Sequence, residues 1–137
     1  MTANYSVSTD KFLLDIEMIV DFLSNQSYWA KGRSRERIER SIANSFCFGV
    51  FDEAGRQVGF ARVVSDCAVF AWLMDVFILE DHRGKGLGKL LMKEIMAHTD
   101  LQDVKKWALG TLDAHGLYKQ FGFTSIAKPE RMMERTT

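Results

Sequence analysis

The most constraining feature of this sequence is a long apolar run that leads directly into a cluster of glycines. Residues 69–79 are apolar at every position except Asp75, a pattern typical of a strand that is buried on both faces of a sheet. The segment Arg83-Gly-Lys-Gly-Leu-Gly88 follows closely, and apolar residues then recur at helical spacing up to Ile95. The sequence therefore predicts an inner strand, a tight turn and a helix in immediate succession.

The remaining periodicity predicts further elements on both sides of this segment. We expect helices at residues 12–23, 34–43 and 114–121, and strands at residues 46–51, 58–64, 107–111 and 123–127. Thr9 or Asp10 can cap the first helix, because a short oxygen-bearing side chain accepts hydrogen bonds from its unpaired amides. The order β-α-α-β-β-β-α-β-α-β predicts an α/β fold. Its sheet is mixed, part antiparallel and part parallel, with flanking helices. The 137 residues suit a single domain, 1–137.

Composition and charge limit the classes of partner and compartment. Lys plus Arg number 18 and Asp plus Glu number 18, so the formal net charge is zero and we expect neither a nucleic-acid nor a membrane partner. No secretory signal opens the chain and no apolar run is long enough for a bilayer, which favours a cytoplasmic protein. Cys47 and Cys67 lie in strand-like runs without metal-ligand spacing. They are expected to be buried free thiols, with no metal site.

The glycine turn has the chemistry of an anion site. Residues 83–88 would gather several backbone N–H groups at a helix N-terminus, and their glycines allow positive φ and close approach of a ligand. Two common phosphate-binding loops do not match. The dinucleotide pattern G-x-G-x-x-G would place its last glycine at Lys89, and the nucleotide P-loop would need Ser or Thr at Leu90. The turn is thus a candidate pyrophosphate cradle of another kind.

Two motifs resemble those of one known family. Arg83-x-x-Gly86-x-Gly88 resembles the R/Q-x-x-G-x-G/A motif of the GCN5-related N-acetyltransferase (GNAT) superfamily. Ala114-His-Gly-Leu-Tyr118-Lys-Gln-Phe-Gly122-Phe123 resembles the second signature of that family, at the separation that the family shows. The expected element order also matches the family's fold, so the resemblance covers essentially the whole chain. It is strongest over residues 46–127.

The resemblance implies acetyl-CoA as cosubstrate and direct transfer of its acetyl group to an amine. It implies that the glycine turn binds the pyrophosphate through Arg83, Gly84, Lys85, Gly86, Leu87 and Gly88. It further implies that backbone groups of Phe77, Ile78 and Leu79 hold the acetyl carbonyl and the pantetheine amides. Thr111 stands where many members have an asparagine, so that cofactor contact is open. Asp113 is expected to cap the following helix rather than to act in catalysis.

Acetyl transfer to an amine needs a neutral amine, a donor to the developing oxyanion and a proton for the leaving thiolate. Tyr118 matches the family's general-acid tyrosine. For the base, Asp75 is the one charged residue in the apolar strand, so it must be paired, protonated or facing a wet cleft. A carboxylate accepting backbone amides at a bulge is the structural alternative. Glu80 and His115 are further candidates for the base, and a chain of waters could replace all three.

The acceptor is expected to be a primary amine of a small molecule. The family builds its acceptor pocket from the first two helices and their loop, where Tyr28 and Trp29 could act as aromatic walls. The basic residues from Arg33 to Arg40 either attract an acidic substrate or form a solvated helix face. A protein or peptide amine is the alternative acceptor, and a non-catalytic acyl-CoA-binding module is the alternative class. Family members often form homodimers, so a homodimer is possible.

Overall fold

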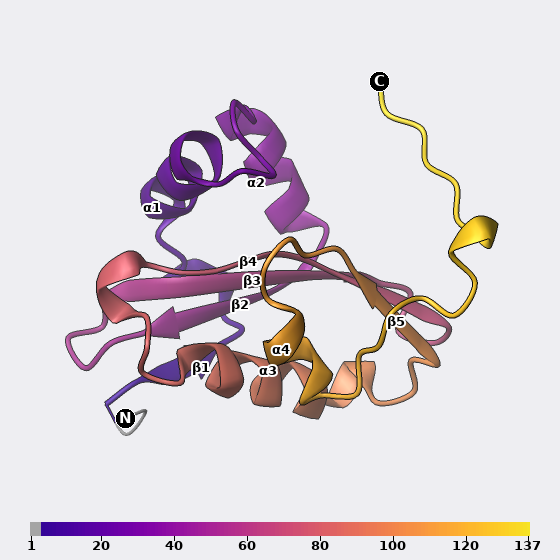
Figure 1. Ribbon diagram of the computed structural model, residues 1–137. Helices are drawn as coiled ribbons and strands as arrows, with labels where there is room; N and C mark the ends of the chain where they lie inside the picture. The colour runs from indigo at the N-terminus through magenta and orange to yellow at the C-terminus, as the bar shows by residue number, and fades with distance from the viewer. Residues whose placement is uncertain (1–3) are drawn as a thin grey trace.

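A mixed five-stranded sheet lies between two layers of helices in the computed structural model, which describes residues 4–137 (Figure 1). The strands run in the spatial order β1-β2-β3-β4-β5. Neighbours from β1 to β4 pair antiparallel, whereas β4 and β5 pair parallel. The predicted α/β class and mixed sheet are therefore confirmed. The strands are β1 (Ser6–Ser8), β2 (Phe46–Phe51), β3 (Gln57–Ser65), β4 (Phe70–Ile78) and β5 (Lys106–Leu109).

The helices cover opposite faces of the sheet (Figure 1). On one face lie α1 (Ile16–Asp21), a π-helix (Phe22–Gln26) that continues it, and α2 (Arg35–Ala43). On the other face lie α3 (Leu87–Ala97) and α4 (His115–Lys119). Short 3-10 helices complete the set at Lys11–Leu13, Glu80–His82, Thr99–Leu101 and Pro129–Arg131.

Each face of the sheet has its own apolar core. Buried residues of α3 pack on one face with Phe48, Val63 and Leu73 of the sheet. The other core joins α1, the π-helix and α2 to Phe60 and Phe77. Leu73 and Phe77 are four residues apart and would share a face of a regular strand, but an irregular point at Asp75 lies between them, and they join opposite cores. Two separate cores fix β4 between the layers.

The first predicted helix is interrupted. Asp10 caps a 3-10 turn by accepting from the Phe12 amide at 2.9 Å, and Asp15 starts α1 by accepting from the Met18 amide at 3.1 Å. The Asp15 amide donates to Oε1 of Gln57 at 2.7 Å, which holds the break against β3. The helix expected at residues 12–23 therefore begins only at Ile16, and Phe12 is 98% exposed before it. The long-range bond to β3 replaces a helical bond at this point.

The predicted strand at residues 123–127 does not form. This segment pairs with no strand among the described residues, and β5 pairs only with β4. Phe123 instead packs edge-on against Tyr118, with ring centroids 6.0 Å apart, while Ile126 is 47% exposed. A strand is stabilised by pairing with a neighbouring strand. Phe123 packs its ring against α4 instead, so this segment has no such pairing.

Two further expectations concern the thiols and the membrane. Cys47 and Cys67 are both free, as predicted, although only Cys47 is buried. The Cys47 thiol lies within 3.6 Å of the Ile42 carbonyl, and burial raises its pKa to about 11. No helix within residues 4–137 combines the length and the apolar character that a membrane crossing requires.

Candidate functional site

The sheet opens between β4 and β5. Their pairing stops at Leu73 and Leu109, although β4 continues to Ile78. In the same region the register between β3 and β4 shifts, and Asp75 has φ 55, the left-handed conformation of a β-bulge. The pairing with β5 ends at Leu73, two residues before this bulge. The edge of β4 beyond Leu73 therefore has no strand partner within the described chain, and its backbone groups face the opening.

The glycine turn continues from this open edge. Gly84 has φ 77 and Gly86 has φ 79, so both occupy the left-handed region that glycine adopts without steric cost. Gly86 is the N-cap of α3, and no side chain accepts a hydrogen bond from the first amides of the helix. These amides and the positive end of the helix dipole are thus available to an anion.

Neighbouring side chains hold the turn in shape. Arg83 donates through Nε to the Ile78 carbonyl at 2.8 Å, which ties the turn back to the end of β4. Nζ of Lys85 lies 3.3 Å from the Tyr5 hydroxyl. At Gly88 an added Cβ would lie 3.2 Å from Cδ2 of Leu117, so this glycine permits close packing of α4 on α3. The three predicted motif residues thus have three different structural roles.

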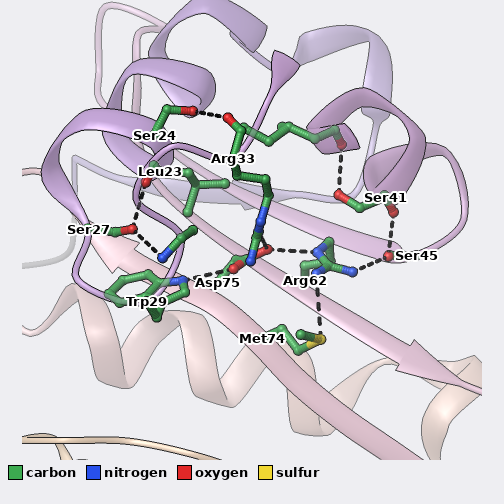
Figure 2. Close-up of polar contacts among 12 residues, drawn as sticks. Leu23, Ser24, Ser27, Trp29, Arg33, Ser41, Ser45, Arg62, Met74 and Asp75 are labelled. Atoms are coloured by element: carbon green, nitrogen blue, oxygen red, sulfur yellow. Dashed lines mark hydrogen bonds and ion pairs between the residues drawn. The ribbon is translucent and has the colours of Figure 1, made fainter. Parts of the chain in front are cut away.

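Asp75 is the centre of a buried polar cluster beneath α1 and α2 (Figure 2). Its side chain is 1% exposed and accepts from Nη1 of Arg33, from Nε of Arg62 and from Nε1 of Trp29, at 2.9, 2.9 and 2.8 Å. The bulge anticipated as an alternative is present, but the donors are side chains rather than backbone amides. Of the three alternatives that the sequence left open for Asp75 (paired, protonated or facing a wet cleft), the structure shows the paired one. Two guanidinium groups bond its carboxylate.

The sequence analysis missed Arg62 and the role of Arg33 in this cluster. Arg62 is the one charged residue in the apolar strand segment 58–64, and a buried charge requires a partner of opposite sign. Asp75 has the same property in the next strand along the chain. Two isolated, opposite charges in consecutive strands of a hairpin were the signal that could have predicted the pair.

Tyr118 lies in α4, where the second motif places it, and is 7% exposed. Its pKa is raised to about 12, first by burial and then by the neighbouring ionisable groups Tyr28 and Asp113. The phenol thus stays protonated through the physiological range and can donate a proton.

A pH dependence of stability follows from this burial. The pKa of Tyr118 is raised in the folded state, so the stabilisation is complete below the ordinary value of 10.0 and is lost as the pH rises toward about 12. We expect the free energy of unfolding to fall more steeply between these values in the wild type than in Tyr118→Phe. Urea unfolding at stepped pH measures the difference. Parallel curves for the two proteins would contradict this environment for the hydroxyl.

Tyr28 and Trp29 lie together in the loop after the π-helix. Their rings meet edge to face with centroids 5.0 Å apart, and they are 57% and 37% exposed. The Tyr28 hydroxyl accepts from the Leu112 amide at 3.0 Å, so this loop reaches the loop between β5 and α4, which rises toward the same side of the sheet (Figure 1). The two aromatic residues therefore flank the opening beside Asp75.

The other predicted site residues occupy the borders of the opening. Glu80 is exposed at the end of β4, and His115 is exposed at the start of α4. Thr111 accepts through Oγ1 from the Ala114 amide at 3.0 Å. Asp113 was expected to cap α4, but Ala114 is the N-cap and no side chain bonds there as a cap, so that prediction is wrong. The side chain that bonds this turn is Thr111 instead.

Cavities lie elsewhere in the molecule. One of about 510 Å³ is lined by residues near the start of β2 and the ends of β3 and α3, at the other end of the sheet from the glycine turn. It contains none of the predicted site residues. The candidate site is the opening along β4, apart from this cavity. Within residues 4–137 no group of three or more His, Cys, Asp or Glu could hold a metal ion.

Comparisons with known proteins show which family the chain resembles. A family model described as an acetyltransferase (GNAT) domain matches residues 43–125. An uncharacterized N-acetyltransferase, ycf52, of Gracilaria tenuistipitata var. liui is 32% identical over 116 residues, which cover 81% of this chain and 61% of that protein. The chain spans 61% of the length of each of the first two curated relatives that it matches.

Solved structures share the fold. A GNAT-family protein from Xanthomonas campestris pv. campestris is 50% identical and superposes with a TM-score of 0.93, covering 97% of this chain and 93% of that one. A GNAT-family acetyltransferase from Elizabethkingia anophelis, solved with acetyl-CoA bound, is 16% identical with a TM-score of 0.66. That match covers 89% of this chain and 77% of that one. At such low identity this second likeness concerns the fold alone.

Proposed function

Because this chain belongs to the GNAT family of acetyltransferases, we propose that it transfers the acetyl group of acetyl-CoA to a primary amine of a small molecule. The observation that carries the proposal is the continuity of two features. The unpaired edge of β4 is followed, after the 3-10 helix Glu80–His82 and the glycine turn, by the uncapped N-terminus of α3. A ligand with an amide-bearing arm and a pyrophosphate needs a strand edge followed by an anion cradle, which is this arrangement.

The residues along this path fit acetyl-CoA. The left-handed Gly84 and Gly86 leave the amides of the turn open to close approach. Residues 77–79 end the strand at the point where the arm would meet the pyrophosphate. Acetyl-CoA supplies an activated thioester when bound. That a fold neighbour was solved with acetyl-CoA bound is consistent with this donor.

The chain's own groups suit direct transfer. Backbone N–H groups of β4 are rigid donors for a developing oxyanion, because the strand is held between two cores. Tyr118 holds a proton on its hydroxyl that a departing thiolate can take. Cys47 is unsuited to carry an acyl group, since its pKa is raised to about 11 and its thiol is buried. With Asp75 occupied by three donors, Glu80 is the remaining carboxylate suited to accept the amine's proton.

Thermal unfolding with ligand tests the proposal. At a concentration of about a hundred times its Kd, a ligand that binds only the folded state adds about 2.7 kcal/mol. We expect acetyl-CoA to raise the Tm by roughly 5–10 °C, and ATP to leave it unchanged. Screening amines for acetyl-CoA-dependent thiol release then tests transfer. Stabilisation with no transfer to any amine would indicate an acyl-CoA-binding module, and no stabilisation would contradict the proposal.

A matched pair of glycine variants distinguishes an effect on acetyl-CoA binding at the glycine turn from an effect on the stability of the fold. Gly86 and Gly55 have φ 79 and φ 84, but Gly55 lies in the turn between β2 and β3, away from the candidate site. Alanine is strained to a similar extent at both positions, roughly 1–2 kcal/mol. We expect Gly86→Ala to weaken acetyl-CoA binding at least tenfold by titration calorimetry, whereas Gly55→Ala keeps wild-type affinity. Equal affinities would place the anion site elsewhere.

A further inference from the structure

The cluster around Asp75 contains an uncompensated positive charge. Arg33 and Arg62 contribute two positive charges and Asp75 one negative charge, and the two arginines have no other ion pair among the described residues. The side chains of Asp75 and Arg62 are 1% and 8% exposed. Charge in such a place is screened weakly by solvent, so the excess acts strongly on a nearby ligand.

The two arginines differ in how many donors remain free. Arg62 directs Nε to Asp75, Nη1 to the Ser45 hydroxyl and Nη2 to Sδ of Met74, so each of its nitrogens has a partner. Arg33 bonds Asp75 through Nη1 alone, and no group in residues 4–137 accepts from its Nε or Nη2. Its side chain is 20% exposed. Arg33 therefore presents a partly buried, fixed guanidinium with donors to spare (Figure 2).

These donors lie beside the expected acceptor position. Trp29 and Arg33 bond the two oxygens of the same carboxylate, Oδ1 and Oδ2. Asp75 itself stands in the bulge where the free edge of β4 begins. A molecule that packs on the exposed ring of Trp29 is consequently within reach of Arg33 and of the open strand edge at once.

We propose that the acceptor amine carries an anionic oxygen group, a carboxylate or a phosphate, that binds the free donors of Arg33. This inference rests on the proposed function and specifies its substrate class. A planar guanidinium fixed by Asp75 pairs with such groups through two hydrogen bonds and loses little conformational entropy on binding. Arg33 thereby selects anionic amines over neutral amines of the same shape.

Matched acceptor pairs provide the test. Phenylalanine is compared with phenylalaninamide, and phosphoethanolamine with ethanolamine, so the two arms distinguish carboxylate from phosphate. The wild type should acetylate the anionic member of one pair at least tenfold more efficiently, measured as kcat/KM. Arg33→Gln should raise the KM for that member about 10–100-fold, since a hydrogen bond to a charged group is lost, and should change the neutral member less than twofold. Arg33→Lys should restore part of the loss.

Control variants separate recognition from folding. Arg37 is exposed on α2 and makes no ion pair among the described residues, so Arg37→Gln removes the same charge without touching the cluster. It should leave both members of each pair unchanged. A merely structural role for Arg33 would lower kcat/KM for anionic and neutral amines alike, and that result overturns the proposal.

Failure of this inference is distinguishable from failure of the proposed function. If no anionic amine is acetylated better than its neutral partner while acetyl-CoA still raises the Tm, then Arg33 does not select the acceptor and the acetyl-CoA site stands. If acetyl-CoA gives no stabilisation, the proposed function fails and this inference fails with it.

Discussion

Replacing Tyr118 with phenylalanine is expected to lower kcat by tenfold or more, on the order of 10²-fold, while leaving the Kd for acetyl-CoA unchanged. The hydroxyl is the only group removed, and the ring keeps its contacts with Phe123 and with the core around α3. The reason for the loss is protonation. The phenol of Tyr118, whose pKa burial raises to about 12, is protonated at neutral pH, so its hydroxyl can hydrogen-bond to the departing thiolate and donate its proton as the thioester breaks. Steady-state kinetics and titration calorimetry with acetyl-CoA measure the two quantities.

A suitable control for Tyr118 is the tyrosine at position 5. Tyr5 contacts His82 and Lys85 beside the glycine turn, at hydrogen-bond distances of 2.9 and 3.3 Å. Tyr5→Phe removes the same hydroxyl near the cradle without altering α4, so kcat should remain near the wild-type value. Unchanged kcat in Tyr118→Phe would remove the general-acid role from Tyr118. A large increase in Kd for acetyl-CoA would instead indicate a binding role.

The second large effect concerns the stability of the Asp75 cluster. Asp75→Asn keeps the shape of the side chain but leaves Arg33 and Arg62 without a counter-charge in a buried site. Breaking a buried ion pair by removing one partner costs about 3–5 kcal/mol. We therefore expect the free energy of unfolding to fall by this amount. Urea denaturation measures it, because a small domain unfolds in a single transition.

Two comparisons establish that this loss comes from the cluster. Asp103 is exposed, and Asp103→Asn should change the free energy of unfolding by less than about 0.5 kcal/mol. Adding Arg33→Gln to Asp75→Asn should cost less than the sum of the single changes, because the second change removes a charge that the first left unpaired. Strict additivity, or a loss below about 1 kcal/mol in Asp75→Asn, would show that the cluster does not hold the loop on β4.

The position of this cluster gives it more than a stabilising role. Asp75 lies in the bulge just beyond the point where the pairing of β4 with β5 ends, and it bonds Trp29 and Arg33 in the loop that borders the opening. One carboxylate thus joins the open strand edge to the loop that is expected to face the acceptor. Changes at Asp75 should consequently alter the KM for the amine more than the Kd for acetyl-CoA, whose cradle lies farther along the chain.

Much of the fold could be predicted because its signals are local. The inner strand, the glycine turn and α3 follow from residues 69–95 alone, since an apolar run, glycine conformations and helical spacing are properties of neighbouring residues. The helix expected at residues 34–43 is likewise present as α2, where Ile38 and Ile42, four residues apart, are both buried. Tyr118 was predicted from a motif whose residues are close in sequence.

What the tertiary structure alone decided depends on residues far apart in the chain. The first helix breaks because the Asp15 amide bonds Gln57, and residues 123–127 form no strand because Phe123 packs on Tyr118 rather than in a ladder. The sequence by itself determined that Asp75 needed a partner, because an unpaired charge in an apolar strand is costly. Arg62 in the neighbouring strand could have been inferred from its isolated charge, but Trp29 and Arg33 could not, because their bonds depend on the bulge and on a loop more than forty residues away in the chain. Local structure follows from interactions between residues that are close in sequence. The partners of a buried charge, by contrast, are determined only when the helices pack on the sheet.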